Sequence, residues 1–121
     1  MGEVVRIEYE LVWLRDRGLQ YLYLTQCKVY ENGSQSAKSI CIFEGYVGTD
    51  SDIKELIVND YLMYAEDVFS IIVMNSIAKA EKDDDVSGYP DLTQYEDFDV
   101  IRRVDAYIIP DKGCFYEEVT I

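Results

Sequence analysis

The sequence predicts an α+β fold in a single domain, residues 1–121: an antiparallel sheet of about five strands (β-β-β-α-β-β) with one long or broken helix packed on one face. Two observations predict it. Apolar and polar residues alternate with a period of two before residue 48 and after residue 97, and two turns there have hairpin composition. Between these segments, residues 49–82 carry apolar side chains at steps of three and four, which is the helical period.

Three strands are expected in the first 47 residues. In residues 5–13 apolar side chains alternate with charged ones, as in a half-buried strand. Residues 19–30 and 37–47 have the composition of a second and a third strand, the third with Gly45 as a bulge or an exit. Asn32-Gly33 is the strongest short signal for a hairpin, so this segment is predicted to be an antiparallel meander.

The helix is predicted over residues 49–82. Asp52-x-x-Glu55 is a helix-start signature, and a main apolar stripe follows it on one face. This stripe consists of Ile53, Leu56, Ile57, Tyr61, Tyr64, Val68, Ile71 and Ile72. A straight helix from Asp52 to Lys82 would span about 45 Å, whereas a domain of this size has a radius of gyration of about 14 Å. We therefore expect the helix to protrude or to break near Asn59-Asp60, where Asp60 is a candidate cap.

A second apolar stripe lies on the far side of this helix. It consists of Val58, Leu62, Phe69 and Val73. A helix that is apolar on two sides packs on two sides, so the second contact is predicted with the rest of the chain or with another protomer, as a homodimer interface. Residues 68–74 are also β-branched enough to form a strand, an alternative that the sequence leaves open.

The last third of the chain is predicted to be a loop and a second hairpin. Residues 82–93 are rich in Asp and contain Gly and Pro, as is typical of a loop. Residues 98–108 alternate apolar and charged side chains, and residues 114–121 form the closing strand. Pro110-Asp111-Lys112-Gly113 between them has proline and glycine at the positions that a tight turn favours.

Residues 83–94 resemble the calcium-binding loop of an EF-hand. The matching residues are Asp83, Asp85 and Ser87 at the first three ligand positions, Gly88 at the sharp turn and Asp91 at the ninth position. The bidentate glutamate of the twelfth position is replaced by Gln94, and the segment that follows reads as a strand instead of a helix. An ordinary acidic loop is favoured, and no metal or cofactor is predicted.

The negative charge is concentrated in the middle of the chain. The net charge is −13, and residues 44–99 hold 15 acidic residues against three lysines. Such a field repels nucleic acid and anionic membranes and attracts basic surfaces; simple solubility is the plainer interpretation. The start has no basic segment followed by an apolar one, so we expect no secretory signal and a cytoplasmic location.

Catalytic and metal-binding chemistry is poorly represented. The chain has no histidine, which removes the commonest general base and zinc ligand. Cys27, Cys41 and Cys114 are odd in number and widely spaced, so they are expected to be reduced core residues. Without a phosphate loop or a nucleophile motif, the sequence predicts that the protein is not an enzyme.

Tyrosines beside carboxylates indicate a surface that meets arginine and lysine. Aromatic anchors supply contact area and cation–π attraction, and acids supply charge complementarity, although most of the 11 tyrosines also fit the core or its rim. The predicted partner-binding residues are Tyr61, Tyr64, Glu66, Asp67, Asp83, Asp84, Asp85, Tyr89, Asp91, Tyr95, Glu96, Asp97 and Asp99. Arg102 and Arg103 are expected to point to opposite faces of their strand, where one neutralises nearby carboxylates.

These features favour a non-catalytic acidic inhibitor that blocks a basic nucleic-acid-binding surface of a partner, such as an enzyme or an effector complex. The chain itself is expected to bind neither nucleic acid nor membrane. Its size and charge fit the general character of anti-CRISPR proteins of phages and of immunity proteins that neutralise nucleases, an analogy and not a motif match. The alternative is a structural or assembly module that forms a homodimer through the central helix.

Overall fold

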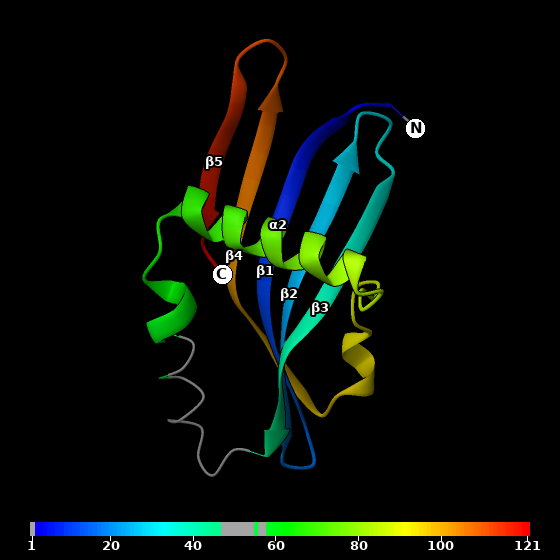
Figure 1. The fold of residues 1–121 in the computed structure, drawn as a ribbon, viewed down its shortest axis with the longest axis vertical. Coiled ribbons are helices and arrows are strands. Elements are labelled where there is room, and N and C mark those ends of the chain that lie inside the picture. Colours follow the sequence, from blue (N-terminus) through cyan, green and yellow to red (C-terminus); the bar gives the residue numbers. More distant parts are fainter. Residues whose placement is uncertain (1, 47–54, 56–57) are drawn as a thin grey trace.

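The computed structural model describes residues 2–46, 55 and 58–121, and in them a five-stranded antiparallel sheet is crossed on one face by an α-helix (Figure 1). The sheet order is β3-β2-β1-β4-β5, so the first strand lies at the centre. The strands are β1 (Val4–Asp16), β2 (Leu19–Tyr30), β3 (Gln35–Tyr46), β4 (Asp97–Ile109) and β5 (Gly113–Val119). The helical segments are the π-helical turn η1 (Val58–Leu62), α2 (Glu66–Lys82) and the 3-10 turn η2 (Leu92–Gln94). The predicted fold class and element order are confirmed.

Both predicted hairpins are present. In the β2–β3 turn Gly33 has a φ of +86°, a conformation that glycine adopts without strain, and the Asn32 side chain accepts a hydrogen bond of 2.9 Å from the Ser34 N–H. In the β4–β5 turn, Asp111 and Gly113 have φ values of +65° and +93°. Local turn chemistry therefore sets the pairing of the strands at both edges of the sheet.

Three register shifts twist the sheet, and the first leaves Val5 of β1 as an extra residue opposite β2. Leu11 pairs with Arg102 but Val12 pairs with Val100, which leaves Ile101 of β4 as an extra residue. Between β2 and β3 the extra residue is Ile42. Bulges of this kind increase the local right-handed twist. Gly45, predicted as a bulge or an exit, is paired in regular register one residue before β3 ends.

The core lies between α2 and the sheet face that it crosses. Phe69, Val73 and Ile77 follow one another at steps of four and are no more than 1% exposed. They form one cluster with side chains from four of the strands, chiefly Leu11, Leu22, Leu24, Ile40 and Val104. The helix is thus held by one narrow stripe of three large side chains.

The structure reverses the predicted faces of the helix. Phe69 and Val73, expected in a stripe free to bind another protomer, are buried against the sheet and form no free surface. Val68 and Ile71, expected in the main stripe, are 39% and 44% exposed. Both stripes have the helical period, so spacing alone does not select the buried one. Of the other predicted dimer residues, Leu62 is 37% exposed and the side chain of Val58 lies outside the described part.

The helix is broken, but not where the sequence predicted. Asn59 and Asp60 lie inside the π-helical turn η1, and the break falls at residues 63–65, before α2 begins at Glu66. The strand alternative for residues 68–74 is wrong, since they are all in α2. Most of the Asp52-x-x-Glu55 signature, with Ile53, Leu56 and Ile57, lies outside the described residues.

The three cysteines are free thiols, as expected, but only Cys27 is buried; Cys41 and Cys114 are exposed. The two exposed cysteines lie on the edge strands, Cys41 on β3 and Cys114 on β5. In the described part of the chain, no helix combines the length and the apolar character that crossing a membrane requires.

Replacing Phe69 by alanine should lower the free energy of unfolding by about 3–5 kcal/mol, because the change removes the largest fully buried side chain and leaves a cavity. Urea unfolding measures the effect. The control is Met74→Ala on the same helix, where the side chain is 44% exposed and the change should stay within about 0.5 kcal/mol. Equal losses for both variants would contradict the assignment of the buried face.

Candidate functional site

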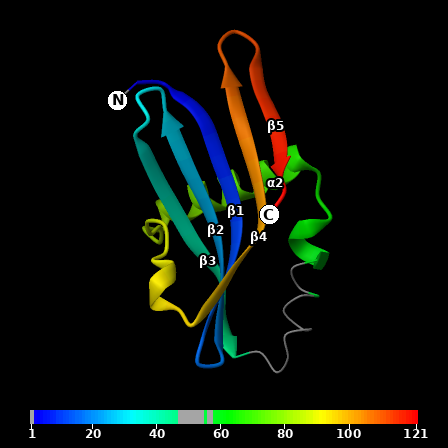
Figure 2. The ribbon, with the colours of Figure 1, turned by 180° about the vertical axis from the view of Figure 1, so that it is seen from behind.

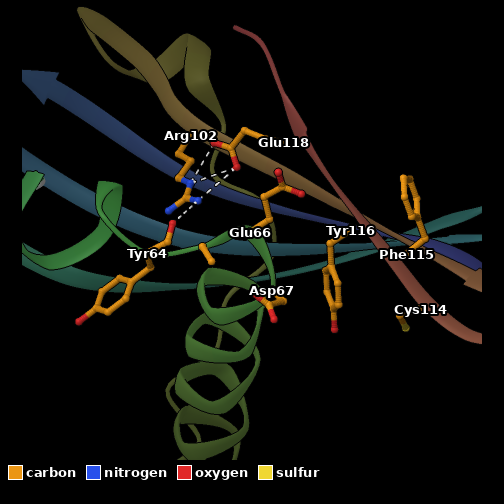
Figure 3. Close-up of a pocket in the computed structure, with 9 residues that line it drawn as sticks. Tyr64, Glu66, Asp67, Arg102, Cys114, Phe115, Tyr116 and Glu118 are labelled. Carbon is orange, nitrogen blue, oxygen red and sulfur yellow. Dashed lines mark hydrogen bonds and ion pairs between the residues drawn. The ribbon is translucent and has the colours of Figure 1, made fainter.

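Arg102 of β4 anchors the chain segment that leads into α2. Its side chain is 6% exposed, and it points to the face that the helix covers. The guanidinium donates a hydrogen bond of 2.6 Å to the Tyr61 carbonyl. It donates others of 2.8 Å to the Tyr64 carbonyl and 3.0 Å to the Glu118 carboxylate (Figure 3). It also lies 4.6 Å from the centre of the Phe69 ring. A buried cation needs this set of partners, because an unpaired charge inside a protein is costly.

An open pocket of about 560 Å³ lies beside Arg102, between the start of α2 and strand β5 (Figure 3). Its lining is Tyr64, Ala65, Glu66, Asp67, Arg102, Cys114, Phe115, Tyr116 and Glu118. Three of these residues are acids and one is a base. Burial, with the nearby Cys114 and Asp67, raises the pKa of Tyr116, as expected beside negative charge. Of the predicted site residues, Tyr64, Glu66 and Asp67 line this pocket, whereas Tyr61 packs against the core and binds Arg102 through its carbonyl.

The side of α2 that faces away from the sheet is apolar along much of its length. We call Tyr64, Val68, Ile71 and Met74 the outer stripe; their exposed fractions are between 39% and 44%. Glu66 and Asp67 lie in the first turn of the helix, where the helix dipole favours negative charge. Residues 83–85, the exposed Asp83, Asp84 and Asp85, follow the last turn, about 25 Å away by the helical rise. Carboxylates thus lie beyond both ends of the outer stripe, and Lys79 and Lys82 of the last turn of α2 stand between Met74 and Asp83.

Residues 86–94 pass the edge of β3 to the other face of the sheet (Figure 2). The backbone groups of Ser87 and Ser39 exchange hydrogen bonds of 2.7 and 2.9 Å. The Asp91 carboxylate accepts from the Thr93 N–H at 3.1 Å and so caps η2. This loop is pinned to the sheet and not wrapped around a centre, and within the described residues no cluster of three or more potential ligands lies close enough for a metal ion.

A separate group of predicted site residues lies at the turn of the β1–β2 hairpin. It consists of Tyr95, Glu96, Asp97 and Asp99. Arg15 makes ion pairs of 2.6 Å with Asp97 and 2.8 Å with Asp99. Glu96 accepts a hydrogen bond from the Arg17 N–H, and the Tyr95 ring meets the Tyr21 ring edge-on at 5.6 Å. The predicted single patch is thus divided among at least four places, one of which holds Tyr89, and in the present group the acids hold β4 to the hairpin.

A fourth acidic group, on the sheet face opposite α2, was missed from the sequence. Arg103 lies 3.0 Å from both Glu8 and Asp105, and Glu10 is buried beside them. Arg102 and Arg103 point to opposite faces, as strand alternation predicts. The hydroxyl of Tyr89, another predicted partner-binding residue, donates to Glu10 at 3.4 Å, and burial together with Glu10 raises the pKa of Tyr89 to about 12.

The signal for this group was present in the sequence. Glu8 and Glu10 share one face of the first strand, and Arg103 and Asp105 share one face of the fourth. The missing information was that these two strands are neighbours, so that Glu8 pairs with Asp105 and Glu10 with Arg103. Only long-range topology brings the four side chains together.

Comparison with protein families, curated proteins and solved structures finds no match to this chain. Its function is therefore inferred from the surface itself.

Glu10→Gln should stabilise the protein more at about pH 7 than at about pH 4. Burial raises the pKa of Glu10 above its ordinary value of 4.5, despite the opposing charge of Arg103. As the pH rises above that value, Glu10 loses its proton more readily in the unfolded chain than in the folded one, so the free energy of unfolding falls. Glutamine does not ionise, so the variant does not lose this stability. Urea unfolding of both proteins across this range measures the difference.

Asp97→Asn is the control with the opposite sign. The hydrogen bond from Arg15 holds the pKa of Asp97 below its ordinary value of 3.8, so its contribution is present above that value and is lost as the pH falls through the folded pKa. The loss caused by Asp97→Asn should therefore be larger at neutral than at acid pH. A pH-independent effect of Glu10→Gln would contradict the prediction.

Proposed function

We propose that this chain is a non-catalytic acidic binding protein that occupies a basic, nucleic-acid-binding surface of a partner protein. The observation that carries the proposal is the outer stripe of α2 with carboxylates beyond both of its ends. Monomeric proteins seldom leave a continuous apolar stripe exposed without a partner for it. Here carboxylates outnumber bases beyond both ends of the stripe, with Lys79 and Lys82 before Asp83, Asp84 and Asp85, and this excess of negative charge favours a partner that is basic at its rim.

The arrangement of charge supports this proposal. Asp83, Asp84 and Asp85 form no ion pair among the described residues, unlike Asp97 and Asp99, which are bound to Arg15. Unpaired carboxylates have no internal bond to lose when they meet arginine or lysine. They would stand in for phosphates, while Tyr64 would supply an aromatic surface where a nucleic acid presents a base.

The buried polar groups support a binding role over a catalytic one. Arg102 is engaged by Tyr61, Tyr64 and Glu118, and Arg103 by Glu8 and Asp105. Groups that satisfy one another inside the protein hold the fold together, and we assign them no reaction. By size and charge the proposed role is that of an anti-CRISPR-like or nuclease-immunity inhibitor, acting in the cytoplasm.

The test of this proposal is displacement of nucleic acid. A fluorescent oligonucleotide is bound to each of a panel of basic nucleases and effector complexes, and the chain is added at low and at high salt. We expect stoichiometric displacement from one target, weakened by salt because attraction between surface charges is screened. A variant with Asp83, Asp84 and Asp85 all replaced by Asn should bind about tenfold more weakly, from the usual worth of three exposed ion pairs.

The matched control carries the same change in net charge on exposed acids away from α2: Glu31→Gln, Asp111→Asn and Glu117→Gln. It should displace the oligonucleotide as well as the unmodified chain does. The proposal fails if the Asp83–Asp85 variant retains full displacement, or if both triple variants lose it equally, since net charge alone would then explain binding.

The second candidate function is a homodimeric assembly module, and the exposed outer stripe is the observation that favours it. A second copy would bring its own carboxylates close to those of the first, so charge favours a basic partner. Light scattering decides between them: we expect the isolated protein to have the mass of one 14.0 kDa chain at low and high salt. Ile71→Glu should then leave this mass unchanged and abolish displacement of the oligonucleotide.

A mass of two chains that Ile71→Glu reduces to one would overturn this expectation and support the homodimer. Ile71 suits the test because its exposed position makes a charge tolerable for folding.

A further inference from the structure

We infer that the pocket between the start of α2 and strand β5 is a receptor for a guanidinium group, namely an arginine side chain of the basic partner. The inference deepens the proposed function and rests on it for the source of the arginine. The pocket itself is defined by Tyr64, Glu66, Asp67, Tyr116 and Glu118 around the bound guanidinium of Arg102 (Figure 3).

The sign of the charge in the pocket excludes an anionic ligand. The free N–H groups at the start of a helix ordinarily attract anions. Here Glu66 and Asp67 occupy that first turn, and Glu118 adds a third carboxylate. The single base, Arg102, already donates to Glu118 and to two backbone carbonyls. The Arg102 charge is therefore already paired within the protein, and the pocket presents a net negative charge to a ligand.

The aromatic side chains favour a cation that is flat and only weakly hydrated. Tyr116 lies beside the helix end that carries Glu66 and Asp67, whereas the Tyr64 ring points away from it on the other side (Figure 3). A guanidinium stacks on aromatic rings and forms paired hydrogen bonds with a carboxylate, whereas the ammonium of lysine is a compact and strongly hydrated charge. The Tyr116 ring and the carboxylates beside it thus favour arginine over lysine.

The volume and position of the pocket fit a side chain delivered by another protein. About 560 Å³ lies within the usual range for ligand pockets, and the pocket is open on its outer side. Tyr64 belongs to both the pocket and the outer stripe, and Asp67 lies one residue before Val68 of the stripe. A partner that covers the stripe therefore has the pocket within reach, and an arginine at its rim would enter it.

The experiment uses the full chain and a small probe. N-acetyl-arginine amide is titrated against isotope-labelled protein, and backbone amide chemical shifts are followed by NMR. We expect saturable shifts at Tyr64, Glu66, Asp67 and residues 114–116, with a dissociation constant of the order of millimolar, as suits one side chain in an open site. N-acetyl-citrulline amide, which has the same shape without the charge, should bind at least fivefold more weakly.

Two pocket variants test the assigned groups. Asp67→Asn and Tyr116→Leu should each weaken binding of the arginine amide by about threefold, within the range measured for exposed ion pairs and cation–π contacts. The matched controls are Asp111→Asn and Tyr46→Leu, exposed residues that do not line the pocket and should leave binding unchanged. Amide spectra of the free variants show that each is folded.

The inference is overturned if the arginine amide causes no saturable shift, if citrulline amide binds equally well, or if the shifts map away from the pocket. These outcomes are distinct from failure of the proposed function. If the chain displaces the oligonucleotide but does not bind the probe, the arginine-receptor inference is wrong and the inhibitor proposal stands. Specific binding of the probe without displacement from any target would support the pocket and count against the inhibitor.

Discussion

The buried guanidinium of Arg102 is the constraint on which the arrangement of the helix depends. It binds the carbonyls of Tyr61 and Tyr64, so the chain that enters α2 is fixed above β4 and close to Glu118 of β5. The Phe69 ring packs over the same guanidinium, which places the first large side chain of the helix on the sheet. With Phe69 in place, the helical period brings Val73 and Ile77 onto the sheet in turn.

The exposed surface follows from the same contact. If Phe69 faces the sheet, then Val68, Ile71 and Met74 must face away from it, since a helix places residues at these steps on other sides. The outer stripe is thus the geometric complement of the buried stripe. Both the proposed interface and the pocket beside it therefore depend on the hydrogen bonds that the buried Arg102 guanidinium makes.

Two consecutive arginines of β4, Arg102 and Arg103, stabilise opposite faces of the sheet. They are consecutive, so their side chains enter opposite faces of the sheet. On the helix side Arg102 binds two backbone carbonyls and the Glu118 carboxylate, and so orders the connection into α2. On the other side Arg103 binds Glu8 and Asp105 near the buried Glu10. The acids that surround Arg103 are fixed by it and are poorly suited to bind a partner, which leaves the free carboxylates at the ends of α2.

The features that sequence predicted well are those set by local chemistry. Asn32-Gly33 and Pro110 to Gly113 determine their turns almost alone, and strand alternation then follows, so the sheet and its hairpins could be predicted. The buried face of α2 could not, because two stripes share the helical period and the choice depends on Arg102, far away along the chain. The division of the predicted patch could not be predicted for the same reason: Arg15 binds Asp97 and Asp99, and no local pattern indicates that pairing.

Solubility alone explains an acidic protein, but it does not explain this distribution of side chains. A chain selected only for solubility would gain from polar residues along the exposed side of its helix, where Val68, Ile71 and Met74 stand instead. It would have no reason to place its unpaired acids beyond the two ends of that apolar stripe. Apolar area would give contact energy and the nearby acids would give selectivity for a basic rim, which is the physical argument for the proposal that another molecule covers the helix.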